Sequence, residues 1–156
     1  MEKRKEKECV IDGEELIMAL ETNDYEAKYY LDRKSGDIFL KLMGDYTAEN
    51  DNELDEKLEK EPDRYVCINP INSSEGWQVM ADFVESLPDS EIKDHLLETL
   101  NLKHPFRSFK SALLNYPNVR SLWFVFHHNS LMQIAQDWLD DNHISAILRF
   151  SANKRA

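Results

Sequence analysis

Six residues in the last third of the chain have side chains that could together bind an anion. Lysine and arginine donate charge-assisted hydrogen bonds to phosphate or carboxylate oxygens, and an aromatic ring offers a flat neighbour to the bound group. The candidate residues are Lys103, His104, Arg107, Lys110, Arg120 and Trp123, with Phe106 as an alternative aromatic neighbour. They predict a basic surface that recognises a small anionic group or a protein partner.

The charge distribution supports this prediction. The chain has 156 residues with 30 acidic and 19 basic side chains, yet residues 99 to 136 contain no Asp or Glu. A core helix excludes charge of both signs, which explains part of the deficit. Residues 102 to 156 still carry 7 basic and 3 acidic side chains, against 11 and 20 in residues 1 to 64. The last third is therefore locally basic in a protein of net charge −11.

Two interpretations of these cations stay open. Arg107 and Lys110 are three residues apart and share one face of a helix. Arg120 falls in the first turn of the next helix, where the helix dipole disfavours a cation, so it needs a partner. The partner is either a ligand or an acid of the preceding helices. The acids within reach by sequence are Asp82, Glu85, Glu91 and Asp94.

The chain offers little for other chemistries. His127 and His128 are adjacent, so their side chains diverge on a helix and cannot chelate one metal ion together. There is no phosphate-binding glycine motif and no nucleophile motif. We expect no metal, no cofactor and no catalytic set. A hydrolase or transferase acting on a phosphorylated substrate at the basic surface is the second hypothesis. Nucleic-acid binding regulated by an acidic segment is the third, and the net negative charge opposes it.

A long helix over residues 118 to 142 is predicted to position the basic surface. Apolar side chains cover more than half of its circumference, which is typical of a helix packed on two sides. Asn118 is predicted as its N-cap and Asn142 as its left-handed C-terminal residue. Its predicted buried face contains Phe124, Val125, His128, Leu131, Met132, Ala135, Trp138 and Leu139.

Shorter elements precede the long helix. Asp12 and Glu15 predict a capped helix from Gly13 to Thr22. Aromatic and branched residues around Gly36 predict a β-hairpin over residues 28 to 42, and Tyr65 to Ile68 a third strand. Three more helices are predicted over residues 72 to 116. Their start signals are the pair Asn72 and Glu75, then Asp89, then Pro105.

Residues 45 to 61 carry eight acids and two lysines with almost no apolar side chain. We interpret this segment as a solvated acidic loop or a frayed helix. The alternative is that it covers a basic surface elsewhere in the fold.

Together these elements predict an α+β fold: an N-terminal helix and a small antiparallel sheet of about three strands, packed against a C-terminal four-helix bundle. Residues 1–10 are predicted to be a disordered tail, 11–150 a single domain and 151–156 a flexible tail.

The acidic composition and the absence of a long apolar run predict a cytoplasmic protein that does not enter a membrane. Cys9 and Cys67 are expected to be reduced thiols. No oligomeric state is predicted.

Ordered blocks of sequence also carry a resemblance to a known family. The blocks are YYLDRKSGDI, then RYVCINPINSSEGWQVMADFVESLPDSEIKDHLLETL, then PFRSFKSALLNYPNVRSLWFVFHHNSLMQIAQDWLDDNHI. Their order resembles the bacterial uncharacterised protein family 0158 from about Ile11 to Ile144. The resemblance implies a bacterial cytosolic origin and brings no established activity, cofactor or catalytic residues. Positions matching the family's pattern are Phe106, Arg107, Phe109, Lys110, Arg120, Trp123 and Phe126.

Overall fold

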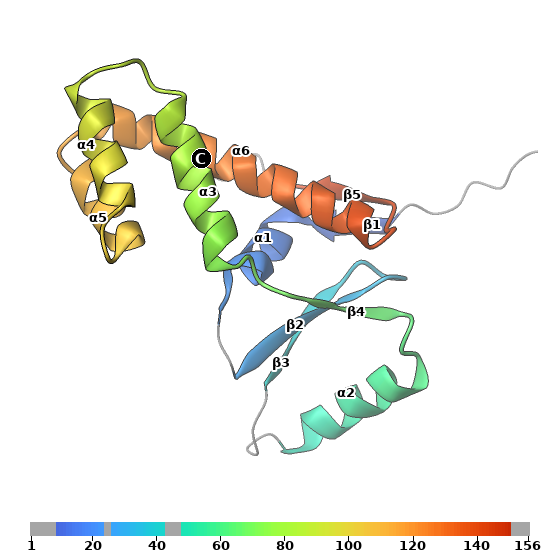
Figure 1. Cartoon of the computed structure of the whole chain (residues 1–156). Helices are drawn as coiled ribbons and strands as arrows, with labels where there is room; N and C mark the ends of the chain where they lie inside the picture. Colours follow the sequence, from blue (N-terminus) through green and yellow to red (C-terminus); the bar gives the residue numbers. More distant parts are fainter. Residues whose placement is uncertain (1–8, 24–25, 43–47, 151–156) are drawn as a thin grey trace, which may run out of the picture. The chain divides into compact units, whose positions relative to one another are not determined.

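The computed structural model describes residues 9–23, 26–42 and 48–150, with the backbone alone for residues 48–53. Contacts divide the chain into two compact units. Unit 1 comprises Met1–Pro70 and Ile134–Ala156, and unit 2 comprises Ile71–Gln133. The long helix α6, Pro117–Asp141, contributes its first part to unit 2 and its last part to unit 1 (Figure 1). That residues 11–150 form a single domain stays a prediction.

Unit 1 contains a three-stranded antiparallel sheet. Strands β2, Ala27–Asp32, and β3, Ile38–Leu42, form a hairpin, and β4, Tyr65–Ile68, pairs with the other edge of β2. Gly36 in the hairpin turn has a φ of 83°, which a residue with a Cβ atom rarely adopts. The predicted hairpin and third strand are confirmed.

A second sheet in unit 1 joins the two ends of the described chain. Strand β1, Cys9–Asp12, pairs in parallel with β5, Ala146–Arg149. The prediction that residues 1–10 form a disordered tail is therefore wrong for Cys9 and Val10, while residues 1–8 and 151–156 lie outside the described residues. Four-residue strands whose partner is more than 130 residues away give no local signal, because neither stands in a hairpin.

Helix α1, Gly13–Glu21, follows β1 directly and agrees with the predicted helix. The carboxylate of Asp12 accepts hydrogen bonds from the backbone N–H groups of Glu14 and Glu15, which would otherwise lack partners. Leu16, Ile17 and Leu20 are buried, as the helical spacing predicts.

The acidic segment forms helix α2, Ala48–Lys60, so its interpretation as a loop is wrong over those residues, and residues 45–47 lie outside the described part of the chain. Spacing favours the helix, because Leu54 and Leu58 are four residues apart and both are half-buried. The carboxylate of Asp55 pairs with the amine of Lys41 on β3 at 3.1 Å. At least this acid therefore neutralises a cation of its own unit.

Unit 2 begins with three helices: α3, Ser73–Glu85; α4, Glu91–Leu100; and α5, Pro105–Leu113. The capping box of Asn72 and Glu75 is present, and Pro105 is the first residue of α5, as predicted. Ser90, rather than the predicted Asp89, caps α4, because its hydroxyl reaches the backbone N–H of Lys93. A cluster of buried side chains connects these helices to α6: Met80, Phe83, Val84, Leu96, Leu100, Phe109, Ala112, Leu113 and Trp123.

Both ends of α6 differ from the prediction. The helix already includes Pro117, so Asn118 lies inside it instead of capping it. Proline is well suited to a first helical position because its missing N–H would have no partner there. At the other end His143, and not Asn142, has the left-handed conformation, with a φ of 57°. The Asn142 amide instead donates to the carbonyl oxygen of Trp138 at 2.8 Å.

The middle of α6 is less buried than its composition predicts. Trp123 is 5% exposed and Leu131 is 6% exposed, whereas Phe124 and Val125, predicted on the buried face, are 52% and 61% exposed. The prediction of packing on two sides is therefore wrong for this part of the helix in the single chain.

Among the described residues the fold has six helices and two sheets, which confirms the α+β class. None of the helices in the described ranges combines the length and hydropathy of a membrane span.

Candidate functional site

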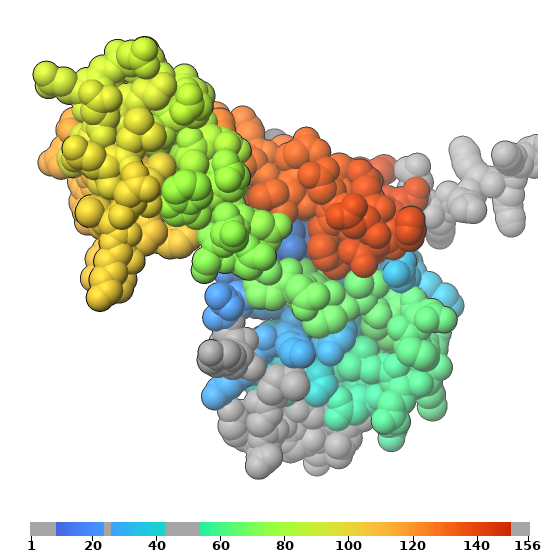
Figure 2. All heavy atoms as spheres, in the orientation of Figure 1, coloured from blue at the N-terminus to red at the C-terminus, as the bar shows by residue number. Residues whose placement is uncertain are grey.

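The structure places the five charged or titratable candidates at the surface of unit 2. Lys103 and His104 precede α5, Arg107 and Lys110 lie on α5, and Arg120 lies in the first turns of α6. All five are exposed, and we call them the basic surface. Residues around 100 to 110, drawn in yellow in Figure 2, reach the surface of the unit in that view.

The cations of α5 face solvent because a different side of the helix is apolar and buried. Phe109, Ala112 and Leu113 are buried and define one side of the helix. At about 100° per residue, Lys110 and Arg107 lie about 100° and about 160° from Phe109. Packing of the apolar side therefore leaves both cations in solvent, as the spacing predicts.

The turn between α5 and α6 is held by a partly buried polar contact. The hydroxyl of Tyr116 and Nδ1 of His95 on α4 are 2.7 Å apart, and their rings meet edge to face. Arg120 follows one helical turn later, and its backbone N–H donates to the carbonyl oxygen of Tyr116 at 2.8 Å. The position of the first turn of α6 is thus fixed relative to α4 within the same unit.

Within the described ranges, no carboxylate oxygen lies within 4.0 Å of the side-chain nitrogens of Lys103, Arg107, Lys110 or Arg120. The acids of α3 and α4 that could have neutralised them are not used in this way. An ion pair at the start of α4 joins Lys93 to Asp89, which precedes the helix, at 3.4 Å.

Arg120 has an aromatic partner where the sequence suggested an acid. Its guanidinium carbon lies 4.8 Å from the ring centroid of Phe124, a cation–π contact between residues four apart on α6. Such a contact leaves the donors of the guanidinium available, because the ring face accepts no classical hydrogen bond. Sequence reasoning did not name Phe124 as a site residue, although its spacing of four from Arg120 was the available signal.

Trp123 is not a surface neighbour of the cations. It is 5% exposed, and its ring centroid lies 5.1 Å from that of Phe109 and 5.3 Å from that of Phe83. Trp123 therefore anchors α6 in the core of unit 2, and the exposed rings near the cations are Phe106, 38% exposed, and Phe124. Of the two aromatic neighbours predicted for the cations, Trp123 is buried and Phe106 is exposed.

Large apolar side chains are exposed on the same two helices. Leu114 at the end of α5 is 66% exposed, and Phe124 on α6, in contact with Arg120, is 52% exposed. A protein surface that combines exposed aromatic and aliphatic groups with arginine resembles the centre of a protein–protein interface. The basic surface therefore has an apolar component that the cations alone did not predict.

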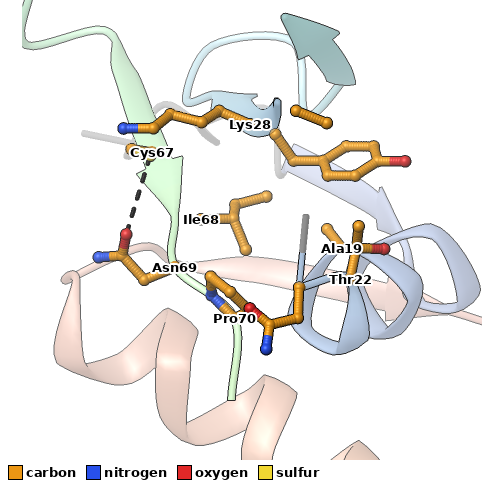
Figure 3. A pocket seen from close by; sticks show the side chains of 10 residues that line it. Ala19, Thr22, Lys28, Cys67, Ile68, Asn69 and Pro70 are labelled. Atoms are coloured by element: carbon orange, nitrogen blue, oxygen red, sulfur yellow. Dashed lines mark hydrogen bonds between the residues drawn. The ribbon is translucent and has the colours of Figure 1, made fainter. Parts of the chain in front are cut away.

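A cavity of about 200 Å³ in unit 1 is a second place to look for chemistry (Figure 3). It lies beside the end of α1 and strands β2 and β4. Successive side chains of a strand point to opposite faces, so Lys28 and Cys67 leave the sheet on the face opposite to Tyr29 and Ile68. Figure 3 shows Ile68 and Cys67 pointing away from each other across β4. The thiol of Cys67 donates to Oδ1 of Asn69 at 3.9 Å, whereas the side chains of Lys28 and Tyr29 leave β2 on opposite faces, so we regard the cavity as the weaker candidate.

The carboxylate of Asp32 in unit 1 is a charged group with a structural role. Asp32, 7% exposed, accepts two hydrogen bonds of 2.8 Å from Nε and a terminal nitrogen of Arg64, and further bonds from the backbone N–H groups of Lys34 and Ser35. These bonds stabilise the carboxylate and lower the pKa of Asp32 to about 2, with the Arg64 bonds the largest cause. The carboxylate thus accepts four hydrogen bonds from its own turn and from Arg64, which identifies it as a group that holds the fold together.

Fold and surface define an α+β protein with an exposed basic face on a helical unit. The profile of the uncharacterised protein family UPF0158 matches residues 6–154, and the chain belongs to this family. The family has no established function.

Relatives support the same assignment. A UPF0158 protein of Pseudomonas aeruginosa is 34% identical over 142 residues, which are 90% of this chain and 88% of the relative. UPF0158 proteins of Chlamydia trachomatis and Chlamydia pneumoniae are 28% and 29% identical, over 85% and 81% of this chain. The chain spans only 40% and 39% of the length of these two chlamydial relatives. No solved structure matches the chain.

Proposed function

We propose that this chain is a binding module that recognises a protein partner through the basic surface of α5 and α6. One observation carries the proposal. Lys103, Arg107, Lys110 and Arg120 are exposed, and among the residues that the structure describes none of them forms an ion pair. Cations that the fold does not use for its own acids are available to acidic groups of another molecule.

The apolar side chains near the cations favour a protein over a small anion. A phosphate or carboxylate ion needs only donors, whereas Phe106, Leu114 and Phe124 offer apolar area that a small anion cannot cover. Aromatic residues and arginine are the types that contribute most to binding energy at protein interfaces. The pair of Arg120 and Phe124 supplies both types in contact with each other.

The net negative charge of the chain directs an acidic partner to the basic surface. With a net charge of −11, the protein repels an acidic partner everywhere except near a basic surface. Electrostatic attraction then orients the partner and speeds association, and it weakens as salt rises. The partner is expected to present acidic groups around an apolar centre.

The test compares partners captured by the full chain and by a charge-reversed variant. Immobilised wild type and Arg107→Glu with Arg120→Glu are incubated at low salt with extract of the organism from which the chain comes, and captured proteins are quantified by mass spectrometry. We expect a defined set of proteins on the wild type and a loss of at least about tenfold on the variant, because attraction becomes repulsion.

A matched control carries the same change of charge elsewhere. Lys34 and Lys60 are exposed in unit 1, and the described structure gives their amines no ion pair. Lys34→Glu with Lys60→Glu should capture the same proteins as the wild type. Equal capture by the wild type and the Arg107 and Arg120 variant, with unchanged melting temperatures, would refute the proposed function.

A further inference from the structure

Helix α6 contains a long uncharged segment that is only partly buried. Residues 121 to 136 include no Asp, Glu, Lys or Arg, in a chain in which 31% of residues are charged. Leu122 and Val125 within this segment are 56% and 61% exposed. An exposed helix face normally carries charged side chains, and their depletion marks the centre of a protein–protein interface. This face of α6 has the composition of a covered surface.

Four exposed residues form a stripe along this face. Asn118, Leu122, Val125 and Asn129 are spaced by four, three and four residues, the spacing of a coiled-coil seam. At about 100° per residue they fall within about 60° of one another around the helix. We call them the uncharged stripe.

The uncharged stripe is separate from the basic surface. Phe124 lies about 130° from the middle of the stripe and Arg120 about 170° from it, by the same helical geometry. Trp123 points away from the stripe into the core of unit 2 and anchors the helix there. A partner on the stripe would therefore leave the contact between Arg120 and Phe124 accessible.

The uncharged stripe has the same order of residue types and the same spacing in both directions along the helix. Its order is amide, apolar, apolar, amide, and its spacing is symmetric about the midpoint between Leu122 and Val125. An antiparallel second copy therefore presents Val125 opposite Leu122 and Asn129 opposite Asn118. Apolar groups meet apolar groups, and each amide, which both donates and accepts, meets an amide. This self-complementarity is what a twofold axis requires of an interface.

We propose that a second copy of this chain packs antiparallel on the uncharged stripe of α6 and forms a homodimer. The residues beside the stripe, Val119, Ser121, Phe126 and His128, include no Asp, Glu, Lys or Arg. Two copies of net charge −11 can thus meet here without bringing like charges into contact. The antiparallel pair also opposes the two helix dipoles, which a parallel pair would align.

The size of the stripe predicts a weak dimer. From Asn118 to Asn129 the helix rises about 17 Å. One helix pair of this length covers less than the roughly 800 Å² per partner of a stable complex, so the dissociation constant should lie in the micromolar range or above.

The first experiment measures self-association of the full chain by sedimentation velocity from about 1 µM to about 500 µM, the range in which a weak dimer dissociates. The wild type should pass from monomer to dimer. Leu122→Glu with Val125→Glu should weaken association at least about tenfold, because carboxylates then oppose carboxylates. Met18→Glu is the matched control, since Met18 is 47% exposed on α1; it should dimerise like the wild type.

A second variant tests the orientation of the two helices. In Leu122→Lys with Val125→Glu, the antiparallel register sets each lysine opposite a glutamate of the other copy, whereas a parallel register sets lysine opposite lysine. This variant should therefore keep self-association within about tenfold of the wild type. Loss of association in both variants, with unchanged melting temperatures, would refute the antiparallel register.

The outcomes for the stripe and for the basic surface can be told apart. Arg107→Glu with Arg120→Glu, which tests the proposed function, should self-associate like the wild type because neither residue belongs to the stripe. A wild type that stays monomeric over the whole concentration range would refute the dimer and leave partner capture by the basic surface untouched.

Discussion

The three-stranded sheet of unit 1 and the α5–α6 segment of unit 2 use the same kinds of charged side chain differently. In the sheet, Arg64 binds Asp32 through two nitrogens and Lys41 pairs with Asp55. Both cations are partly buried, so their charge must be compensated within the fold. On α5 and α6 the cations are exposed, and solvation alone suffices to keep them charged. An exposed cation without an internal acid is therefore available for a function, whereas a partly buried and paired one is committed to the structure.

Glycine substitutions give the largest expected difference between the two regions. Alanine at Gly36 would force a φ of 83° on a residue with a Cβ atom and would press that atom against the carbonyl oxygen of Val10. We expect Gly36→Ala to lower the free energy of unfolding by about 2 to 4 kcal/mol. Urea denaturation followed by circular dichroism measures it.

The matched substitution in unit 2 is Gly76→Ala on α3. A Cβ atom there would meet the edge of the Phe106 ring at 3.3 Å, which a small ring movement relieves, and alanine favours a helix by up to about 1 kcal/mol. Gly76→Ala should therefore be neutral or slightly stabilising. A similar loss of stability in both variants would contradict the difference drawn between the two regions.

Asp32→Asn tests the paired charge in unit 1. The pKa of Asp32 is lowered from 3.8 to about 2, so the folded state favours the carboxylate. Its contribution is complete above about pH 4 and is lost as the pH falls through about 2, because both states are then protonated. We expect Asp32→Asn to cost about 2 kcal/mol at pH 7 and nearly nothing at pH 2.

Urea denaturation of both proteins at several pH values provides the measurement. Asp37→Asn is the control, since Asp37 is exposed in the same turn and should change stability by less than about 0.5 kcal/mol at any pH. A difference between wild type and Asp32→Asn that does not shrink towards pH 2 would show that Arg64 does not set the pKa of this carboxylate.

Reversal of the basic surface should have the smallest effect on stability. Arg107→Glu breaks no ion pair of the described structure, and Arg120→Glu exchanges a cation–π contact for a favourable acid in the first turns of α6. The free energy of unfolding of the double variant should stay within about 0.5 kcal/mol of the wild type. A loss of 2 kcal/mol or more in urea denaturation would place these arginines with Arg64 as structural cations.

Elements with local signals were predictable from the sequence. The hairpin follows from Gly36 between two branched and aromatic runs, and α3 from the capping box of Asn72 and Glu75. Strands β1 and β5 were missed because four-residue strands pair across almost the whole chain. The left-handed position at His143 was missed because asparagine adopts this conformation more readily than histidine, so Asn142 was chosen; its amide instead donates to a backbone carbonyl oxygen.

The candidate site was predictable in its residue types and less so in its surroundings. Helical spacing placed Arg107 and Lys110 on the outer side of α5, where they are found. Spacing could not tell which aromatic residue would be exposed, because Trp123 and Phe124 are neighbours on a helix that is apolar over more than half of its circumference. The core of Phe83 and Phe109 accepts Trp123, and that choice leaves Phe124 beside Arg120.

The amino-acid order alone determined the local features: where helices begin, which turn needs a glycine, and where acids are absent beside the cations. These depend on backbone preferences and on charge over a few residues. Only the tertiary structure decided that Asp32 and Asp55 neutralise cations of unit 1, that the cations of α5 and α6 form no ion pair with the described residues, and that one face of α6 is exposed. Pairing and burial depend on which distant segments meet, and short-range spacing carries no information about that.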